Sequence, residues 1–375
     1  MRLTRPETRP ETRPEIRPES RPATRLRTRT RTPGIRSSRS TRSTRTRTCA
    51  AALACCTATL CLTASCSSGH KKPDAAPTGS TTSSTSVSGN VSPLTGLPGP
   101  AGKILAVKID NIVYARPQTG LASADVVYAI EVEGGLSRFL AVYDSNHLPA
   151  GGKIGPVRSA RESDLPILEQ YGKVDFAYSG ALSVFLPVLA AADISNTSPD
   201  QDGAAFSRDD SRNAPYNEYL NPAKVLSDFP DTAAAKDIGF RFGAAPAGGV
   251  PTATATARMP SASFTFTWDA GKGEYLIAMD GRDASTTDGG ALGAPTIVLQ
   301  KVAETTSPRG FHDVPDQLSP YAPTVGTGQA VVLRDGNSYT GTWSRPNDAA
   351  TTSFTVNGRP MPFHPGQVWI VLTPQ

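Results

Sequence analysis

The chain has 375 residues, enough for one or two domains, and a formal net charge of +5. Residues 1–48 hold 15 of its 38 basic and 4 of its 33 acidic residues, so the remaining chain carries 23 basic and 29 acidic residues. The basic balance therefore belongs to the N-terminal segment alone, and we expect no nucleic-acid partner.

The first 66 residues have the composition of a targeting segment. Residues 1–48 consist of TRPE-like units followed by alternating Arg and Thr, with almost no apolar side chains, which predicts a disordered leader. All five cysteines lie within residues 49–66, in an uncharged apolar run that is too short for a transmembrane helix of about 20 residues. This run is typical of the hydrophobic region of a signal peptide, with Arg45 and Arg47 as its charged flank.

The apolar run ends in Leu62-Thr63-Ala64-Ser65-Cys66, which resembles a bacterial lipobox. In that motif the cysteine is diacylated and becomes the mature N-terminus, so we predict lipidation of Cys66; the alternative is an ordinary cleaved signal peptide with an incidental cysteine. Residues 67–92 are rich in Ser, Thr and Gly, and we expect a flexible tether spanning about 28 Å. These features predict an extracytoplasmic protein anchored to the cell membrane.

Residues 93–242 alternate strand and helix patterns and are predicted to form an N-terminal α+β domain with a mixed sheet. Short apolar runs and a central Gly-Gly turn predict strands at 104–110, 125–133, 138–143, 153–157 and 174–178. Helical patterns cover 165–171, 182–192 and 222–229, and the last begins with Asn221 as N-cap and Pro222 at its first position.

Residues 243–258 are rich in Gly, Ala, Pro and Thr and are predicted to be a linker. Residues 259–375 are predicted to form a β-rich C-terminal domain, with strands at 263–268, 275–279, 296–302, 329–334, 338–343, 353–356 and 368–372. Asp335-Gly336 and Asn357-Gly358 predict two-residue hairpin turns. The fold class expected for the whole is α+β.

Several kinds of catalytic chemistry have no signature here. The sequence contains no HExxH, P-loop, GxSxG or CxxC motif, and Cys66 would be the only cysteine of the mature chain, which excludes thiol catalysis. His147, His312 and His364 each lie in a predicted loop, where a surface or capping role is the ordinary one. We therefore expect neither a metal nor a cofactor.

Glu131, Glu133 and Arg138 flank the predicted Gly134-Gly135 turn. If the two glycines are the central turn residues, Glu131 lies directly opposite Arg138 on one face of the hairpin. A cross-strand ion pair is the interpretation we favour. The two glutamates also share a face about 7 Å apart, which leaves a carboxylate pair as a second interpretation.

A possible anion site follows from the arginines near two strand ends. Asp110 ends one strand and Arg116 follows it, while Arg158, Ser159 and Arg161 lie between another strand and a helix. Free N–H groups at a helix start and open guanidinium edges both bind anions, so we predict that these residues converge on a pocket. The alternative is that Ser159 caps the helix, as part of a capping box, and the arginines only brace the fold.

The stretch from ARPQTGL to GPVRSAR, together with LAVKIDN, GTW and HPGQVWIVL, closely resembles the YerB-like lipoproteins over residues 93–375. The resemblance implies a two-part envelope lipoprotein built on a domain of unknown function, and it implies no reaction. The chain departs from the family pattern at its leader, at Ala129 where an acidic residue is expected, and at Tyr216 where histidine is expected.

Two functions remain open at this point. The first is a lipid-anchored, non-catalytic envelope protein that binds a partner protein or an anionic cell-wall ligand. The second is an enzyme acting on a phosphorylated envelope substrate, because the order of Asp110, Arg116, Asp125 and the Arg158/Arg161 loop is similar to the LytR-CpsA-Psr phosphotransferases. Those enzymes use arginines and an aspartate-held divalent ion.

Overall fold

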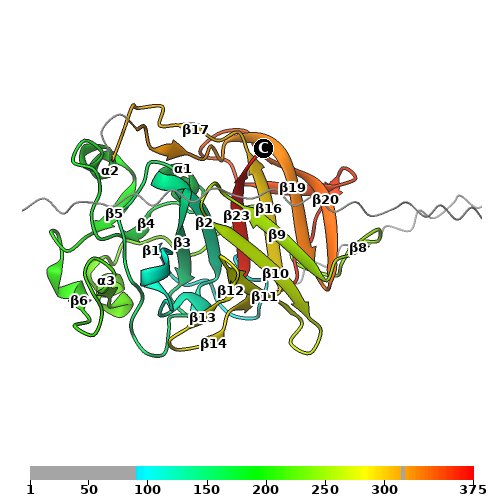
Figure 1. Cartoon of the computed structure of the whole chain (residues 1–375), viewed down its shortest axis with the longest axis horizontal. Coiled ribbons are helices and arrows are strands. Elements are labelled where there is room, and N and C mark those ends of the chain that lie inside the picture. Colours follow the sequence, from blue (N-terminus) through cyan, green and yellow to red (C-terminus); the bar gives the residue numbers. More distant parts are fainter. Residues whose placement is uncertain (1–89, 314–316) are drawn as a thin grey trace, which may run out of the picture. The chain divides into compact units, whose positions relative to one another are not determined.

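A mixed sheet of twelve strands is the main element of the computed structural model, which describes residues 90–313 and 317–375. It runs across the view from β5 on the left to β20 on the right (Figure 1). The order along the sheet is β22 (Arg359–Pro360), β21 (Ser353–Val356), β20 (Asn337–Arg345), β19 (Gly326–Arg334), β16 (Thr296–Val302), β23 (Val368–Pro374), β2 (Val126–Val132), β3 (Leu136–Asp144), β1 (Ile104–Asp110), β4 (Val174–Ala177) and β5 (Ile194–Thr197), with β8 (Val250–Pro251) paired to β20.

The last strand of the chain joins the two halves of this sheet. β23 pairs in parallel with β2 through Val126↔Val368 and in parallel with β16 through Thr296↔Val368. Strands from the predicted domains 93–242 and 259–375 therefore belong to one sheet, and the described residues form one compact unit.

A second sheet of five strands covers one face of the main sheet. It contains β12 (Arg282–Asp283), β11 (Glu274–Met279), β10 (Ser263–Asp269), β9 (Thr254–Arg258) and β15 (Gly293–Ala294). Smaller pairs are β13 (Ser285–Thr286) with β14 (Gly290–Ala291), β17 (Thr305–Thr306) with β18 (Pro320–Tyr321), and β6 (Phe206–Arg208) with β7 (Glu218–Leu220).

Helices are few and short. They are α1 (Asp164–Glu169), α2 (Leu186–Ala191) and α3 (Pro222–Asp228), with 3-10 turns η1 (Val113–Ala115), η2 (Leu121–Ser123), η3 (Glu133–Gly135) and η4 (Gly203–Ala205). All three α-helices lie at the β1–β4–β5 end of the main sheet (Figure 1). In the part of the chain that the structure describes, no helix has the length and apolar character needed to cross a membrane.

The central strands of the main sheet are buried on both faces, since successive side chains of a strand point to opposite faces and nearly all of theirs are buried. In β3, Leu140 and Val142 pack in the core that contains α1 and α2 residues. Phe139, Ala141 and Tyr143 pack in the other core, against the second sheet and α3. This double burial explains why the central strands are almost continuously apolar.

Most predicted elements are confirmed, and the α+β class holds in its coarse form, with strands dominating. Strands 104–110, 296–302 and 353–356 have the predicted bounds, and the hairpin 125–143 is present. The Asn221 cap is also confirmed, since its side chain accepts a hydrogen bond from the Lys224 N–H at 3.1 Å.

Two elements differ from the prediction. Residues 153–157 make only isolated bridges, because Pro156 has no N–H with which to continue a strand ladder. Within the predicted linker 243–258, residues 254–258 form β9, which pairs with β10. Cys66, the leader and the tether up to residue 89 lie outside the described residues.

Two predicted turn dipeptides are confirmed, whereas the predicted register of the β2–β3 hairpin is wrong. Both residues of Asp335-Gly336 and of Asn357-Gly358 have positive φ, as a two-residue hairpin turn requires. In the β2–β3 hairpin, however, η3 makes a connection of three residues.

The register of the β2–β3 hairpin is consequently shifted by one residue. Ile130 lies opposite Arg138, and Glu131 lies opposite Ser137. Because a shift of one residue moves a side chain to the other face, Glu131 and Arg138 do not face each other. The predicted Glu131–Arg138 ion pair is therefore wrong.

Candidate anion-binding site

A pocket of about 170 Å³ lies where β1 ends and β3 begins. Asp110 and Arg138 are direct cross-strand partners there. The loop after residue 156 joins them, since the Arg158 N–H donates to the Lys108 carbonyl at 2.8 Å. We call this cavity the arginine pocket; its polar lining includes Asp110, Glu133, Arg138, Arg158, Tyr216 and Asp313.

Arg158 is held at one side of its guanidinium and open at the other. Its Nε lies 2.9 Å from Asp110 Oδ2, an ion pair without the alignment of a hydrogen bond. Asp110 is itself fixed, because its other oxygen accepts from the backbone N–H groups of Asn111 and Ile112. The side chain of Arg158 is one quarter exposed, and its terminal nitrogens make no hydrogen bond to any residue that the structure describes. These nitrogens are available to a ligand.

Arg138 lacks a counter-ion in the described part of the chain. No carboxylate oxygen of the described residues lies within 4.0 Å of its guanidinium, and its buried Nε has no hydrogen-bond partner among them. Nη1 donates only a long bond of 3.4 Å to the Ser159 carbonyl. Burial, with the nearby Arg161 and Arg158 charges, lowers the pKa of Arg138 to about 10, while the Asp110 and Glu133 carboxylates oppose that shift, so it stays charged at neutral pH. Arg138 is half-buried, and a buried guanidinium nitrogen without a partner is costly; an anion in the pocket would offset that cost.

Arg161 has no open edge. Its Nε donates to both Glu133 oxygens at 2.8 Å, and its Nη2 pairs with Asp313 at 2.7 Å. Nη1 donates to the Ala160 carbonyl, and the side chain is 6 % exposed. Burial raises the pKa of Glu133, but the bonds and charge of Arg161 outweigh it and hold that pKa below its ordinary value. Arg161 therefore braces the fold, as the alternative interpretation proposed.

Ser159 does not cap the following helix. α1 begins later, at Asp164, and Glu162 bonds Ser307 and Arg309 from the C-terminal half instead of the helix start. Ser159 contributes its carbonyl to Arg138, and the predicted capping box is wrong.

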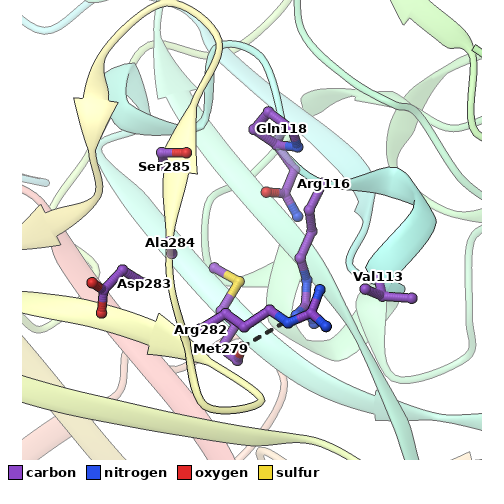
Figure 2. A pocket seen from close by; sticks show the side chains of 9 residues that line it. Val113, Arg116, Gln118, Met279, Arg282, Asp283, Ala284 and Ser285 are labelled. Atoms are coloured by element: carbon purple, nitrogen blue, oxygen red, sulfur yellow. Dashed lines mark hydrogen bonds between the residues drawn. The ribbon is translucent and has the colours of Figure 1, made fainter.

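Arg116 lies in a different cavity, of about 200 Å³, which Arg282 also lines. Figure 2 shows the Arg116 side chain extending toward the Met279 carbonyl, to which its Nη1 donates. Its Nη2 pairs with Asp280 at 2.7 Å and donates to the Asn111 carbonyl at 2.6 Å. The prediction that Arg116 converges with Arg158 on one pocket is wrong.

A buried ion pair between Lys108 and Asp164 holds the loop that lines the arginine pocket. Lys108 Nζ lies 2.6 Å from Asp164 Oδ1, and both side chains are inaccessible to solvent. Burial lowers the pKa of Lys108, while the Asp164 carboxylate opposes that shift. Because Asp164 Oδ2 also accepts from the Arg161 N–H at 2.7 Å, this pair orders the loop that carries Arg158.

The residues of the phosphotransferase alternative are not brought together. Asp125 lies five residues before Ile130, which is level with Arg138, so it is roughly 17 Å away along the sheet. There its carboxylate accepts from the Asp144 N–H and contacts His147 Nδ1 at 2.7 Å. Among the described residues, no group of three or more His, Cys, Asp or Glu side chains is placed to hold a metal ion.

Sequence reasoning missed several residues of the pocket. Arg138 was assigned to an ion pair with Glu131, and Glu133 was considered only as part of a carboxylate pair with Glu131. Tyr216 was noticed as a departure from a family pattern and as part of a polar loop, residues 213–217, that could lie near the arginines. Asp313 lies 152 positions after Arg161 in the sequence, and no local signal connects them. The predicted convergence of Asp110 and Arg158 did point to this place, and both residues line the pocket.

Comparison with known protein families defines the class of protein. The family profile described as "Protein of unknown function (DUF3048) N-terminal domain" matches residues 94–236, and the profile of its C-terminal domain matches residues 255–370. The chain belongs to this family, and the resemblance to the YerB-like proteins is confirmed.

Two comparisons identify particular relatives. The chain is 37% identical over 119 residues to "Putative lipoprotein YerB" of Bacillus subtilis (strain 168), and this match spans 31% of the chain and about a third, 34%, of that relative's length. The crystal structure of the YerB protein from Bacillus subtilis matches with a TM-score of 0.64 and 22% identity, covering 76% of this chain and 97% of the other. The structural likeness supports the shared fold.

Proposed function

We propose that this chain is a lipid-anchored extracytoplasmic protein that binds a small anionic group of a cell-envelope ligand in the arginine pocket. The anchoring part of the proposal is supported by the Cys66 motif, by the Ser/Thr-rich tether and by the name lipoprotein given to its relative. The binding part is supported by the geometry of the pocket.

The unpaired charge of Arg138 is the observation that carries the proposal. Arg161 is offset by Glu133 and Asp313, and Arg158 by Asp110. Arg138 has no such partner among the described residues, although its Nε is buried at the pocket. Charge-assisted hydrogen bonds to a carboxylate or phosphate are about twice as strong as neutral ones, so an anion would satisfy this guanidinium.

Calorimetric titration with inorganic phosphate and with acetate tests the binding. We expect saturable binding of at least one anion to the tethered globular part, and its loss in Arg138→Gln. Arg282→Gln is the matched control, because Arg282 lines the separate cavity of Figure 2. Equal binding by both variants, or no binding by the unaltered protein, would overturn the assignment of the pocket.

Mass spectrometry of the mature N-terminus tests the anchor. Two acyl chains give firm membrane attachment, whereas one gives only marginal attachment. We expect a diacylated Cys66 and release of the protein from the membrane fraction in Cys66→Ala, with Cys61→Ala as the control. An unmodified mature terminus at another residue would refute the anchor and leave the pocket proposal untouched.

A further inference from the structure

An exposed aromatic surface adjoins the arginine pocket. Tyr216 lines the pocket, and its ring centroid lies 5.9 Å from the Arg158 guanidinium carbon. The ring of Tyr114 lies 5.9 Å from that of Tyr216, at an interplanar angle of 32°. Tyr114 is 72% exposed, so a face of its ring is open to solvent. We call these two rings the aromatic platform.

The aromatic platform is ordered before any ligand arrives. Arg212, in the loop that precedes Tyr216, donates to the Ala115 carbonyl at 3.1 Å and to the Pro117 carbonyl at 2.7 Å. These bonds tie the Tyr216 loop to the segment that carries Tyr114. A ligand that packs on the platform therefore pays little for ordering it.

The aromatic platform continues an exposed apolar stretch of the chain. Single exposed apolar side chains are ordinary, but here Val113, 45% exposed, is adjacent to Tyr114, and the Tyr114 ring contacts Tyr216, which lines the arginine pocket. Val113 itself lines the separate cavity of Arg116. Contiguous apolar surface rimmed by polar groups marks a ligand site. Tyrosine is well suited to such a site, since its ring gives a large rigid contact and its hydroxyl remains hydrated.

We propose that the arginine pocket and the aromatic platform together bind an acidic sugar. The carboxylate enters the pocket and pairs with Arg138 and the open end of Arg158, while the apolar C–H face of a neighbouring pyranose ring packs on Tyr114. This inference rests on the proposed anion binding and names the class of ligand.

The charge balance of the site favours an isolated carboxylate over a densely charged polymer. The three arginines at the site (Arg138, Arg158 and Arg161) are matched by three carboxylates (Asp110, Glu133 and Asp313), so its formal charges balance. Only the Arg138 guanidinium and the open end of Arg158 have donors left for a ligand, which suits a single carboxylate. A nucleic acid carries a phosphate at every residue and needs a broad basic surface, whereas the chain after residue 48 has more acidic than basic residues. A sugar with one carboxylate between neutral rings matches both the pocket and the platform.

Binding of two matched tetrasaccharides tests the inference. One alternates glucuronic acid with N-acetylglucosamine, and the other contains N-acetylglucosamine alone; acetate is titrated beside them. We expect the acidic tetrasaccharide to bind and the neutral one not to. Tyr114→Ala should weaken the acidic tetrasaccharide about threefold to tenfold and leave acetate unchanged, because it removes one aromatic contact. Tyr114→Phe should restore the affinity, and Val250→Ala, at an exposed position of β8, should have no effect.

The outcomes separate this inference from the proposed function. Acetate binding that depends on Arg138, with tetrasaccharide affinity unaffected by Tyr114→Ala, would overturn the sugar and leave anion binding intact. Loss of all dependence on Arg138 would overturn both. Preference for an acidic peptide over the tetrasaccharide, with the same dependence on Tyr114, would assign the platform to a protein partner and refute the acidic sugar.

Discussion

Replacing Asp164 by Asn should destabilise the fold far more than replacing any surface aspartate. Asp164 neutralises Lys108 in a site where both side chains are inaccessible to solvent and the charged atoms are 2.6 Å apart. Asparagine keeps the shape and still accepts the Arg161 N–H, but it leaves Lys108 as a buried charge without a counter-ion. Breaking a buried ion pair in this way costs about 3–5 kcal/mol.

The loss should depend on pH in a defined direction. Burial already lowers the pKa of Lys108 from its ordinary 10.5, and the Asp164 carboxylate is the main force that opposes this shift. Without that carboxylate the folded state binds fewer protons than the unfolded state, so the free energy of unfolding rises with pH until Lys108 is deprotonated in both states. The variant should therefore recover stability between neutral pH and the ordinary pKa of lysine.

Urea unfolding of the chain at pH 7 and pH 9.5 measures both effects. Asp237→Asn is the matched control, because it breaks an exposed pair with Arg241 and should cost less than about 1 kcal/mol. Adding Lys108→Met to Asp164→Asn should restore most of the loss, since no buried charge remains. A cost for Asp164→Asn no greater than that of the control, or one that is the same at both pH values, would refute the argument.

Three further predictions concern stability. Burial and the neighbouring Glu131 carboxylate raise the pKa of Glu304 to about 7. The proton that Glu304 binds in the folded state therefore stabilises the fold fully below about pH 4, and this contribution is lost as pH rises through 7. Glu304→Gln should flatten that decline in the free energy of unfolding, measured with urea between pH 5 and 8. Gly358→Ala, at a φ of 72° with open space around it, should cost about 1 kcal/mol by backbone strain alone, and a thermal midpoint equal to that of the unaltered protein would contradict this. Asn221→Ala should cost about 1 kcal/mol by removing the bond to the Lys224 N–H, whereas Asn221→Ser should cost little.

Sequence alone determined the features that depend on neighbouring residues. The apolar runs 104–110 and 296–302 are strands because their β-branched and apolar side chains favour a buried sheet, whatever the order of the strands. Asp335-Gly336 and Asn357-Gly358 are turns because Gly, Asn and Asp tolerate positive φ. These preferences act over two to seven residues, and a reader of the sequence has all of that information.

Only the tertiary structure decided which strands pair and which side chains surround each arginine. β23, the last strand, pairs with β2 although about 240 residues separate them, and only packing of both faces of the sheet specifies that position. The same applies to the arginines: Arg158 and Arg161 look alike in the sequence, but Glu133 and Asp313 fill the edge of Arg161, while Arg158 remains open. Whether a guanidinium stabilises the fold or is free to bind a ligand depends on which carboxylates contact it. Those carboxylates are distant in the sequence, so the three-dimensional packing of the chain decides.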